Sequence, residues 1–261
     1  MGKTYFSLAA IHKQESPFLK EWIDYHLLVG VEHFYLGCND DNDSEVLSIL
    51  KPYIERNVVT HIHIPGICKQ LEFYKMIVQT VSSKWVGFID ADEFILPINT
   101  QTVSELLSKY EQFGGLSICW RVYGSKFDMN PKSQINELLY RLTDSLTEKH
   151  PYATIKTIVQ PSLVIGISNP HNFSYRDGYF SINEKFNRVD DMFCRPITCD
   201  DITLNHYWLR SKDWYFNVKR KRGRSDIGPG DFYDEYLFDY VNDNATVFDD
   251  LISRKYGEKS F

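Results

Sequence analysis

The chain has 261 residues, of which 43% are hydrophobic and 25% are charged, and its formal net charge is −6. This composition is ordinary for a soluble globular protein, and the acidic balance gives no support to nucleic-acid binding. The five cysteines are an odd number without a C-x-x-C pair, which argues against a disulfide framework and against a zinc knuckle. We find no secretory leader and no apolar run of membrane-spanning length, and we expect a cytoplasmic protein, at most peripheral at the inner face of a membrane.

The first hundred residues alternate between segments typical of strands and segments typical of helices. Strands are expected at 5–11, 33–37, 58–64 and 85–89, and helices at 16–30, 44–53 and 70–81. Ser16 and Pro17 begin the first helix, with serine as the capping residue and proline in the first turn. Alternation at this spacing predicts an α/β fold with a mainly parallel central sheet flanked by helices. Neither a Gly-x-Gly-x-x-Gly motif nor a Walker A loop is present to hold phosphate.

The remainder of the chain has a weaker pattern. Strands are expected at 116–122, 154–160, 163–167 and 203–209, and helices at 102–110, 135–142, 213–220 and 245–255. The segment 169–201 is expected to be rich in loops. Because repeats and low-complexity linkers are absent, we expect a single domain over 1–261, composed of a first half (1–97), a second half (98–224) and a C-terminal tail (225–261).

The stretch from Lys84 to Pro97 carries the strongest functional signal. Its apolar run predicts a buried strand that ends in Asp90, Asp92 and Glu93. Alternate residues of an extended chain share a face, so Asp90 and Asp92 point the same way at the edge where open α/β sheets bind ligands. Two neighbouring carboxylates are tolerated when a cation lies between them, and Mg²⁺ or Mn²⁺ would also bind nucleotide phosphates. The alternative is that the two aspartates only cap a turn.

Several motifs together make the sequence similar to GT-A fold glycosyltransferases, specifically the family 92-like group with its relatives of the family 2 type. The first half carries most of them: Lys13-Gln14-Glu15, Glu21-Trp22 with Tyr25-His26, Gly30-Val31 with His33-Phe34, the acidic turn at 39–44, Gln70 with Tyr74, and Phe88 to Phe94. The second half carries the others: Trp120 with Gly124-Ser125, the segment 156–161, His171, His206-Tyr207, Lys219 and Arg222-Gly223. Gln14 stands where the family usually has Asn, and Tyr123 where it has Phe. The similarity is dense over residues 5–97 and sparse to about residue 224.

The resemblance implies an enzyme, an inverting glycosyltransferase that moves a sugar from a nucleotide sugar, expected to be UDP-linked, to a hydroxyl group of a glycan or lipid-linked glycan. Such an enzyme would act in surface polysaccharide or lipopolysaccharide synthesis. The expected cofactor is Mn²⁺ or Mg²⁺, which would stabilise the charge on the leaving diphosphate. Asp92 is the expected direct ligand, Asp90 would contact the metal or the ribose, and His206 is the candidate for a further ligand. His171 competes with His206 for that role.

Other candidate residues each have a structural alternative. The residues expected to bind the nucleotide sugar are Glu15, Asp43, Gln70, Asp90, Lys219 and Arg222. Asp43 could equally cap a helix, and the cluster 219–224 could be a solvated helix end. Trp120 could stack on the acceptor sugar or pack in the core. His61 and His63 alternate like a ligand pair but are expected at the surface.

Inversion requires a general base that takes the proton of the acceptor. The resemblance suggests Glu137, because it lies near the start of the helix after the Trp120 strand, where inverting GT-A enzymes often place the base, and Asp190 and Asp191 are rivals. Two other function classes stay open. One is a metal-dependent nucleotidyltransferase, which would usually need a phosphate-gripping loop. The other is a non-catalytic carbohydrate- or nucleotide-binding protein of the same fold.

Overall fold

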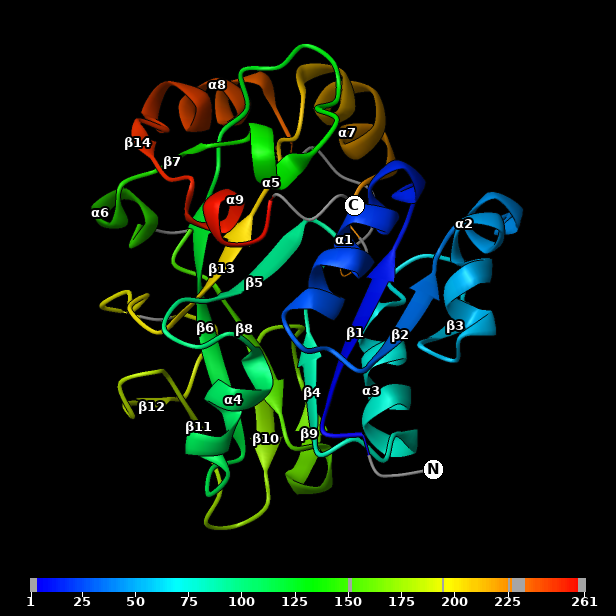
Figure 1. Ribbon diagram of the computed structural model, residues 1–261, viewed down its shortest axis with the longest axis vertical. Coiled ribbons are helices and arrows are strands. Elements are labelled where there is room, and N and C mark those ends of the chain that lie inside the picture. The colour runs from blue at the N-terminus through cyan, green and yellow to red at the C-terminus, as the bar shows by residue number, and fades with distance from the viewer. Residues whose placement is uncertain (1–3, 150–151, 194, 225, 227–232, 258–261) are drawn as a thin grey trace.

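The computed structural model describes residues 4–149, 152–193, 195–224, 226 and 233–257 (Figure 1). The first half contains β1 (Phe6–His12), α1 (Ser16–Leu28), β2 (His33–Cys38), α2 (Ser44–Glu55), β3 (Val59–His63), α3 (Gln70–Thr80) and β4 (Trp85–Phe88). Each of these elements falls within a few residues of its predicted position, and the alternation of strands and helices is confirmed.

The chain from β5 onward is built from shorter elements. Its strands are β5 (Glu93–Pro97), β6 (Gly115–Val122), β7 (Tyr140–Arg141), β8 (Ile155–Val159), β9 (Val164–Ile167), β10 (Phe173–Tyr175), β11 (Ser181–Ile182), β12 (Arg188–Val189), β13 (Ile202–His206) and β14 (Val247–Phe248). Its helices are α4 (Val103–Leu107), α5 (Gln134–Glu137), α6 (Asp144–Thr147), α7 (Arg220–Arg222), α8 (Glu235–Asn244) and α9 (Leu251–Tyr256). Two 3₁₀ turns, Ser108–Tyr110 and Pro161–Leu163, and a π-helix, Trp214–Lys219, complete the described elements.

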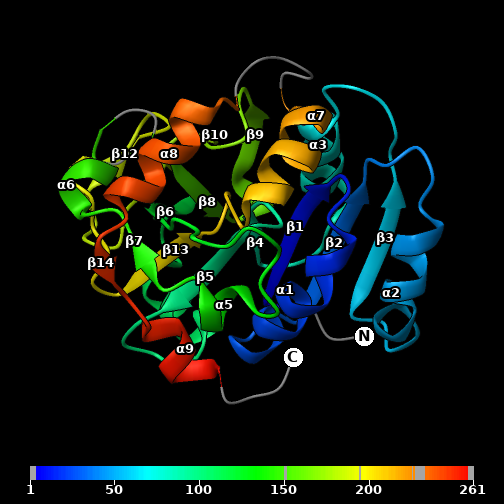
Figure 2. The ribbon, with the colours of Figure 1, turned by 90° about the horizontal axis from the view of Figure 1, so that it is seen from above.

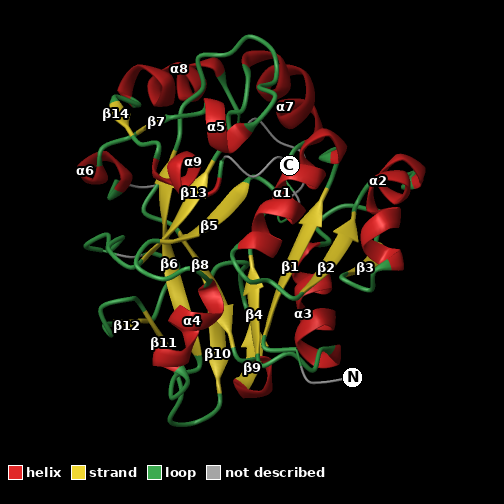
Figure 3. Ribbon diagram, in the orientation of Figure 1, coloured by secondary structure: helices red, strands yellow, loops and turns green. Residues whose placement is uncertain are grey.

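The central sheet has the strand order β12-β11-β6-β8-β4-β1-β2-β3 (Figure 3). β1 runs parallel to β2 and β4, and β2 runs parallel to β3, so the carboxyl ends of these four strands meet at one edge. β8 is inserted antiparallel between β4 and β6. β13 pairs with both β6 and β5, and it thereby returns the late part of the chain to the end of β4.

Helices cover both faces of the sheet, as Figure 2 shows for α1 and α3 on opposite sides of β1. Alternate residues of β1 enter different clusters: Leu8 and Ala10 pack with α1 and α2, whereas Ala9 and Ile11 pack with α3. This division follows from the period of two in a strand. A sheet buried on both faces holds its strand ends rigidly, and those ends position the site.

Several predictions in the later part of the chain were wrong or incomplete. The helix expected at 135–142 ends at Glu137, because the next residues form β7 and pair with β14. That same pairing interrupts the helix expected at 245–255, of which only α9 is helical. The strand β5 was not predicted, although Phe94, Ile95 and Leu96 in it are fully buried. Strand pairing overrides local helix propensity in the first two cases.

No helix in the described part of the chain combines the length and the apolarity that crossing a membrane requires.

Candidate functional site

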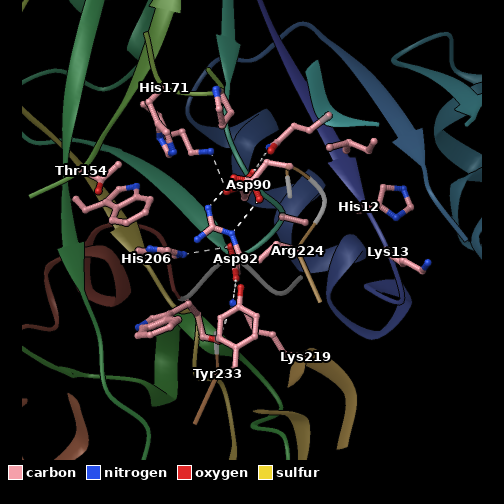
Figure 4. Close-up of a pocket in the computed structure, with 18 of the residues that line it drawn as sticks. His12, Lys13, Asp90, Asp92, Thr154, His171, His206, Lys219, Arg224 and Tyr233 are labelled. Carbon is pink, nitrogen blue, oxygen red and sulfur yellow. Dashed lines mark hydrogen bonds and ion pairs between the residues drawn. The ribbon is translucent and has the colours of Figure 1, made fainter. Parts of the chain in front are cut away.

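A pocket lies at the carboxyl ends of β1 and β4, bordered by β6, β8 and β13 (Figure 4). Most of the predicted site residues line it: Glu15, Gln70, Asp90, Asp92, Trp120, His171, His206, Lys219 and Arg222. The pocket therefore brings together side chains that are as far apart in the sequence as Glu15 and Arg222, a separation of 207 positions.

Asp90 is held by two donors from different elements. Gln70, at the start of α3, donates from Nε2 to Oδ1 at 3.1 Å, and Lys156, from β8, donates from Nζ to Oδ2 at 2.8 Å. Lys156 is 1% exposed. Burial alone would lower the pKa of its ammonium group, but the carboxylates of Asp90 and Glu93 outweigh burial and raise it. Asp90 thus sits against a permanent buried cation.

Glu93 lies beneath this pair and is fully buried. One of its carboxyl oxygens accepts a hydrogen bond from the backbone N–H of Asp90 at 2.7 Å and lies 4.0 Å from Lys156 Nζ. Burial raises the pKa of Glu93 well above its usual range. Glu93 therefore holds the backbone of Asp90 in place through this hydrogen bond, and its own side chain does not line the pocket.

Asp92 is the centre of a second charged group. Lys219, the last residue of the π-helix, donates from Nζ to Asp92 Oδ2 at 2.7 Å, and Nε2 of His206 lies 3.4 Å from Oδ1. Burial alone would raise the pKa of Asp92, but the ammonium of Lys219 outweighs burial and holds it well below the usual range. Asp92 is therefore a buried carboxylate whose charge is balanced by protein groups.

His206 enters the pocket from the end of β13 and lies against Trp120 of β6, with 4.3 Å between the ring centroids. Burial lowers the pKa of His206, so its imidazole is neutral at pH 7. Its Nδ1 has no hydrogen-bond partner among the described residues. His171 also lines the pocket, but its Nδ1 is bonded to the backbone carbonyl of Ile155 at 2.9 Å. His206 is therefore the better placed of the two rival histidines beside Asp92.

Glu15 lies at the pocket wall between two guanidinium groups. Arg210 and Arg222 each form an ion pair with it, the latter at 2.5 Å. Burial would raise the pKa of Glu15, but these two arginines hold it below its usual range. Because Glu15 is 3% exposed, its carboxylate is committed to this contact.

Arg210 and Lys156 were not predicted as site residues. Arg210 donates to the backbone carbonyl of Ala91, between the two aspartates, at 2.9 Å, and to Gln134 Oε1 at 2.8 Å. Its guanidinium also lies 3.8 Å from the ring centroid of Phe18. Lys156 belongs to a predicted strand, and it is the one charged residue of that strand, which was the available signal for it.

Four predicted residues do not line the pocket. Asp43 accepts a hydrogen bond at 2.8 Å from His61 of β3, the outermost strand of the sheet. Glu137 accepts from the backbone N–H of Ser133 at 2.9 Å and caps α5. Asp190 and Asp191 are exposed: Asp190 pairs with Arg188, and Asp191 accepts from the backbone of Phe193. Asp191 nevertheless precedes Met192 and Phe193, which line the pocket.

The side chains of Asp90, Asp92 and His206 meet some of the requirements of a divalent-cation site, but not all of them. Asp92 and the neutral His206 offer a carboxylate and an imidazole, which suit Mn²⁺. All four carboxylate oxygens of Asp90 and Asp92, however, already face Gln70, Lys156, His206 or Lys219. The described residues contain one other group of three potential metal ligands, His12, Cys38 and Asp40. Their ligand atoms all lie within 4.8 Å of one another.

The sheet with helices on both faces, and the pocket at its carboxyl edge that holds both aspartates among several basic side chains, have the arrangement expected of the GT-A fold. The family model for glycosyltransferase family 92 matches residues 3–191, and the chain belongs to this family.

Curated relatives of the chain carry the same family name. A glycosyltransferase family 92 protein of Ricinus communis is 27% identical over 180 residues, which cover 66% of this chain and 32% of the relative. A family 92 protein of Oryza sativa subsp. japonica is 28% identical over 179 residues, covering 66% and 30%. The chain thus spans about a third of the length of these relatives.

Solved structures with some similarity include TarS of S. aureus in complex with UDP, at 12% identity and a TM-score of 0.41, covering 61% of this chain and 47% of that one. The mannosyltransferase PcManGT of Pyrobaculum calidifontis, in complex with GDP-Man and Mn²⁺, has 12% identity and a TM-score of 0.38, covering 46% and 37%.

Proposed function

We propose that the chain is a metal-dependent inverting glycosyltransferase that transfers a sugar from a nucleotide sugar, with UDP as the preferred nucleotide, to a hydroxyl group of a glycan acceptor. The observation that carries the proposal is the pair Asp90 and Asp92 at the end of β4, facing a pocket that also holds Lys219 and Arg222. Membership of family 92 supports the same class of reaction. Surface polysaccharide or lipopolysaccharide synthesis remains our proposal for the pathway.

Asp92 and His206 are the residues that would hold Mn²⁺, and the metal would supply positive charge against the leaving diphosphate. Lys219 lies within hydrogen-bond distance of the same carboxylate, so its ammonium would stabilise the same negative charge. Gln70 and Asp90, which are hydrogen-bonded to each other, are proposed to contact the ribose. The buried arrangement holds these groups in place before the donor binds.

The acceptor is proposed to bind near Trp120, whose ring lines the pocket beside His206. An aromatic ring offers a sugar an apolar face, and the indole N–H of Trp120 has no hydrogen-bond partner among the described residues. For the general base, Asp191 is better placed than Glu137, because it adjoins residues that line the pocket. Asp226 is an additional candidate, since it lines the pocket itself and pairs with Arg224 at 2.6 Å.

The proposal is tested by incubating the purified chain with Mn²⁺ and a panel of UDP- and GDP-sugars, with separate assays for nucleoside diphosphate and pyrophosphate. Release of UDP that requires Mn²⁺ and falls at least a hundredfold in Asp92→Asn is the expected result. Asp239→Asn, on the exposed face of α8, is the matched control and keeps the activity. Release of pyrophosphate in a parallel incubation with nucleoside triphosphates and sugar 1-phosphates would instead identify a nucleotidyltransferase. Donor binding without any turnover, with or without glycan acceptors, would identify a non-catalytic binder.

A further inference from the structure

A second cluster of potential metal ligands lies at the ends of β1, β2 and β3, on the side away from Lys156. His12 is in register with Cys38, and Cys38 is in register with His63. Side chains at paired positions of parallel strands point to the same face of the sheet. These three residues therefore form one row, and Asp40 follows Cys38 by two residues. Nδ1 or Nε2 of His12, Sγ of Cys38 and a carboxylate oxygen of Asp40 all lie within 4.8 Å of one another.

His12 is the unusual member of this cluster. Its side chain is 2% exposed, and neither ring nitrogen has a hydrogen-bond partner among the described residues. A buried polar group without a partner costs free energy, about 1–3 kcal/mol for a neutral one. The protein keeps this imidazole next to a thiol and a carboxylate, where a bound cation would satisfy it.

The surrounding contacts hold the cluster in place. Asp40 Oδ1 accepts from the backbone N–H of Gln14 at 2.8 Å, which leaves Oδ2 facing the thiol of Cys38 at 3.6 Å. His63 Nε2 donates to the backbone carbonyl of Asp40 at 2.8 Å. The side chain of Asn39 donates to the carbonyls of Ile64 and Gly66. Such outer contacts are the kind that orient metal ligands.

We propose that His12, Cys38 and Asp40 form a zinc site, distinct from the Asp90–Asp92 pair. Imidazole, thiolate and carboxylate are the ligands that zinc takes in proteins, and three protein ligands leave a fourth position for water. Tetrahedral zinc places its ligand atoms about 3.3–3.7 Å apart, so the cluster needs to close by about 1.5 Å at most. A thiolate ligand favours Zn²⁺ over the Mn²⁺ or Mg²⁺ proposed for the aspartates.

Zinc binding would change the protonation of the cluster. Burial raises the pKa of Cys38 to about 12, so its sulfur carries a proton at neutral pH when no metal is bound. On binding, the Sγ–Zn bond forms as the S–H bond breaks, and the proton leaves to solvent. Because His12 also lines the pocket, the zinc would lie at the pocket wall and fix the orientation of that ring.

The experiment uses Co²⁺ as a spectroscopic probe on the chain stripped of metal by a chelator. The expected result is a thiolate-to-cobalt absorption band that saturates at one equivalent and is displaced by Zn²⁺. Cys38→Ser abolishes the band, and His12→Ala and Asp40→Asn each weaken zinc binding at least tenfold in competition with a chromophoric chelator. Cys68→Ser, an exposed cysteine outside the cluster, is the matched control and leaves the band unchanged.

Thermal unfolding of each variant shows whether it is folded, and Asp40→Asn keeps the test valid where Cys38→Ser fails to fold. A chain that binds no cobalt through a thiolate, or that keeps the full band in Cys38→Ser, overturns the proposal. The readout is metal binding alone, so it does not depend on glycosyl transfer. A chain inactive toward nucleotide sugars could still hold zinc, and an active one could lack it.

Discussion

The ammonium group of Lys219 lies 2.7 Å from a carboxylate oxygen of Asp92, although 127 residues separate them in the sequence. A parallel contact joins Lys156 to Asp90 at 2.8 Å. Each aspartate at the end of β4 therefore receives a cation from the second half of the chain. These lysines lower the cost of holding two neighbouring carboxylates together, of which Asp92 is buried and Asp90 is partly exposed, and they leave positive charge beside the proposed diphosphate position.

Replacing Lys219 by alanine should destabilise the fold, because it leaves the carboxylate of Asp92 buried without its closest cation. The expected loss is about 3–5 kcal/mol in the free energy of unfolding, measured by urea denaturation. Lys221→Ala, two residues further along on an exposed position, is the control and should change stability by less than about 0.5 kcal/mol. Equal effects of the two substitutions would contradict the importance of this ion pair.

We expect replacement of Arg210 to affect both nucleotide affinity and the free energy of unfolding, because Arg210 donates hydrogen bonds to Glu15, Gln134 and the backbone carbonyl of Ala91. We expect Arg210→Lys to lose most of these contacts, since an ammonium group cannot reproduce the planar fork of a guanidinium. Its unfolding free energy should fall by about 2–4 kcal/mol, and its nucleotide affinity should fall with it. A double-mutant cycle with Glu15→Gln measures the coupling. Additive effects would show that Glu15 and Arg210 act independently.

Stability should decline below neutral pH through His26, which is fully buried. Its Nδ1 donates to the carbonyl of Trp22 at 2.8 Å, and its Nε2 accepts from the backbone N–H of Ile95 at 3.2 Å. Burial lowers the pKa of His26 to about 3, against about 6.5 in the unfolded chain.

The unfolded state therefore binds a proton that the folded state does not. Above pH 6.5, neutral His26 makes its full contribution to the free energy of unfolding. As the pH falls from 6.5 toward 3, this contribution decreases by about 1.4 kcal/mol per pH unit. The measurement is the unfolding free energy of the native chain and of His26→Gln between pH 4.5 and 7.5. The two curves should converge at this slope as the pH falls, and parallel curves would refute the assignment.

The choice of general base can be made by comparing three conservative substitutions. We expect Glu137→Gln to act on stability, because its carboxylate caps α5, and to leave kcat within a factor of about three. Asp191→Asn and Asp226→Asn test the two carboxylates at or beside the pocket, and removal of the base should lower kcat by about a hundredfold or more. A hundredfold loss in Glu137→Gln alone would restore Glu137 as the base.

The sequence was sufficient to predict the first half of the fold, because its strands and helices have clear apolar periods and short connections. It also predicted the acidic end of β4, where Asp90 and Asp92 follow a buried run directly. It did not predict that Lys156 and Arg210 would reach this position, since such contacts depend on how β8 and β13 are ordered in the sheet. Glu137 was placed at the site by resemblance, whereas local hydrogen bonding places its carboxylate at the start of α5.

The measurement that tests the central claim most directly is the melting temperature of the chain with UDP, with Mn²⁺, with both and with neither. A ligand at a hundred times its Kd stabilises the folded state by about 2.7 kcal/mol, which should raise the melting temperature by several degrees. Our account predicts this rise with UDP and Mn²⁺ together, and its loss in Asp92→Ala but not in Asp239→Ala. No shift with any nucleotide, with or without metal, or an undiminished shift in Asp92→Ala, would contradict a donor site built on Asp92.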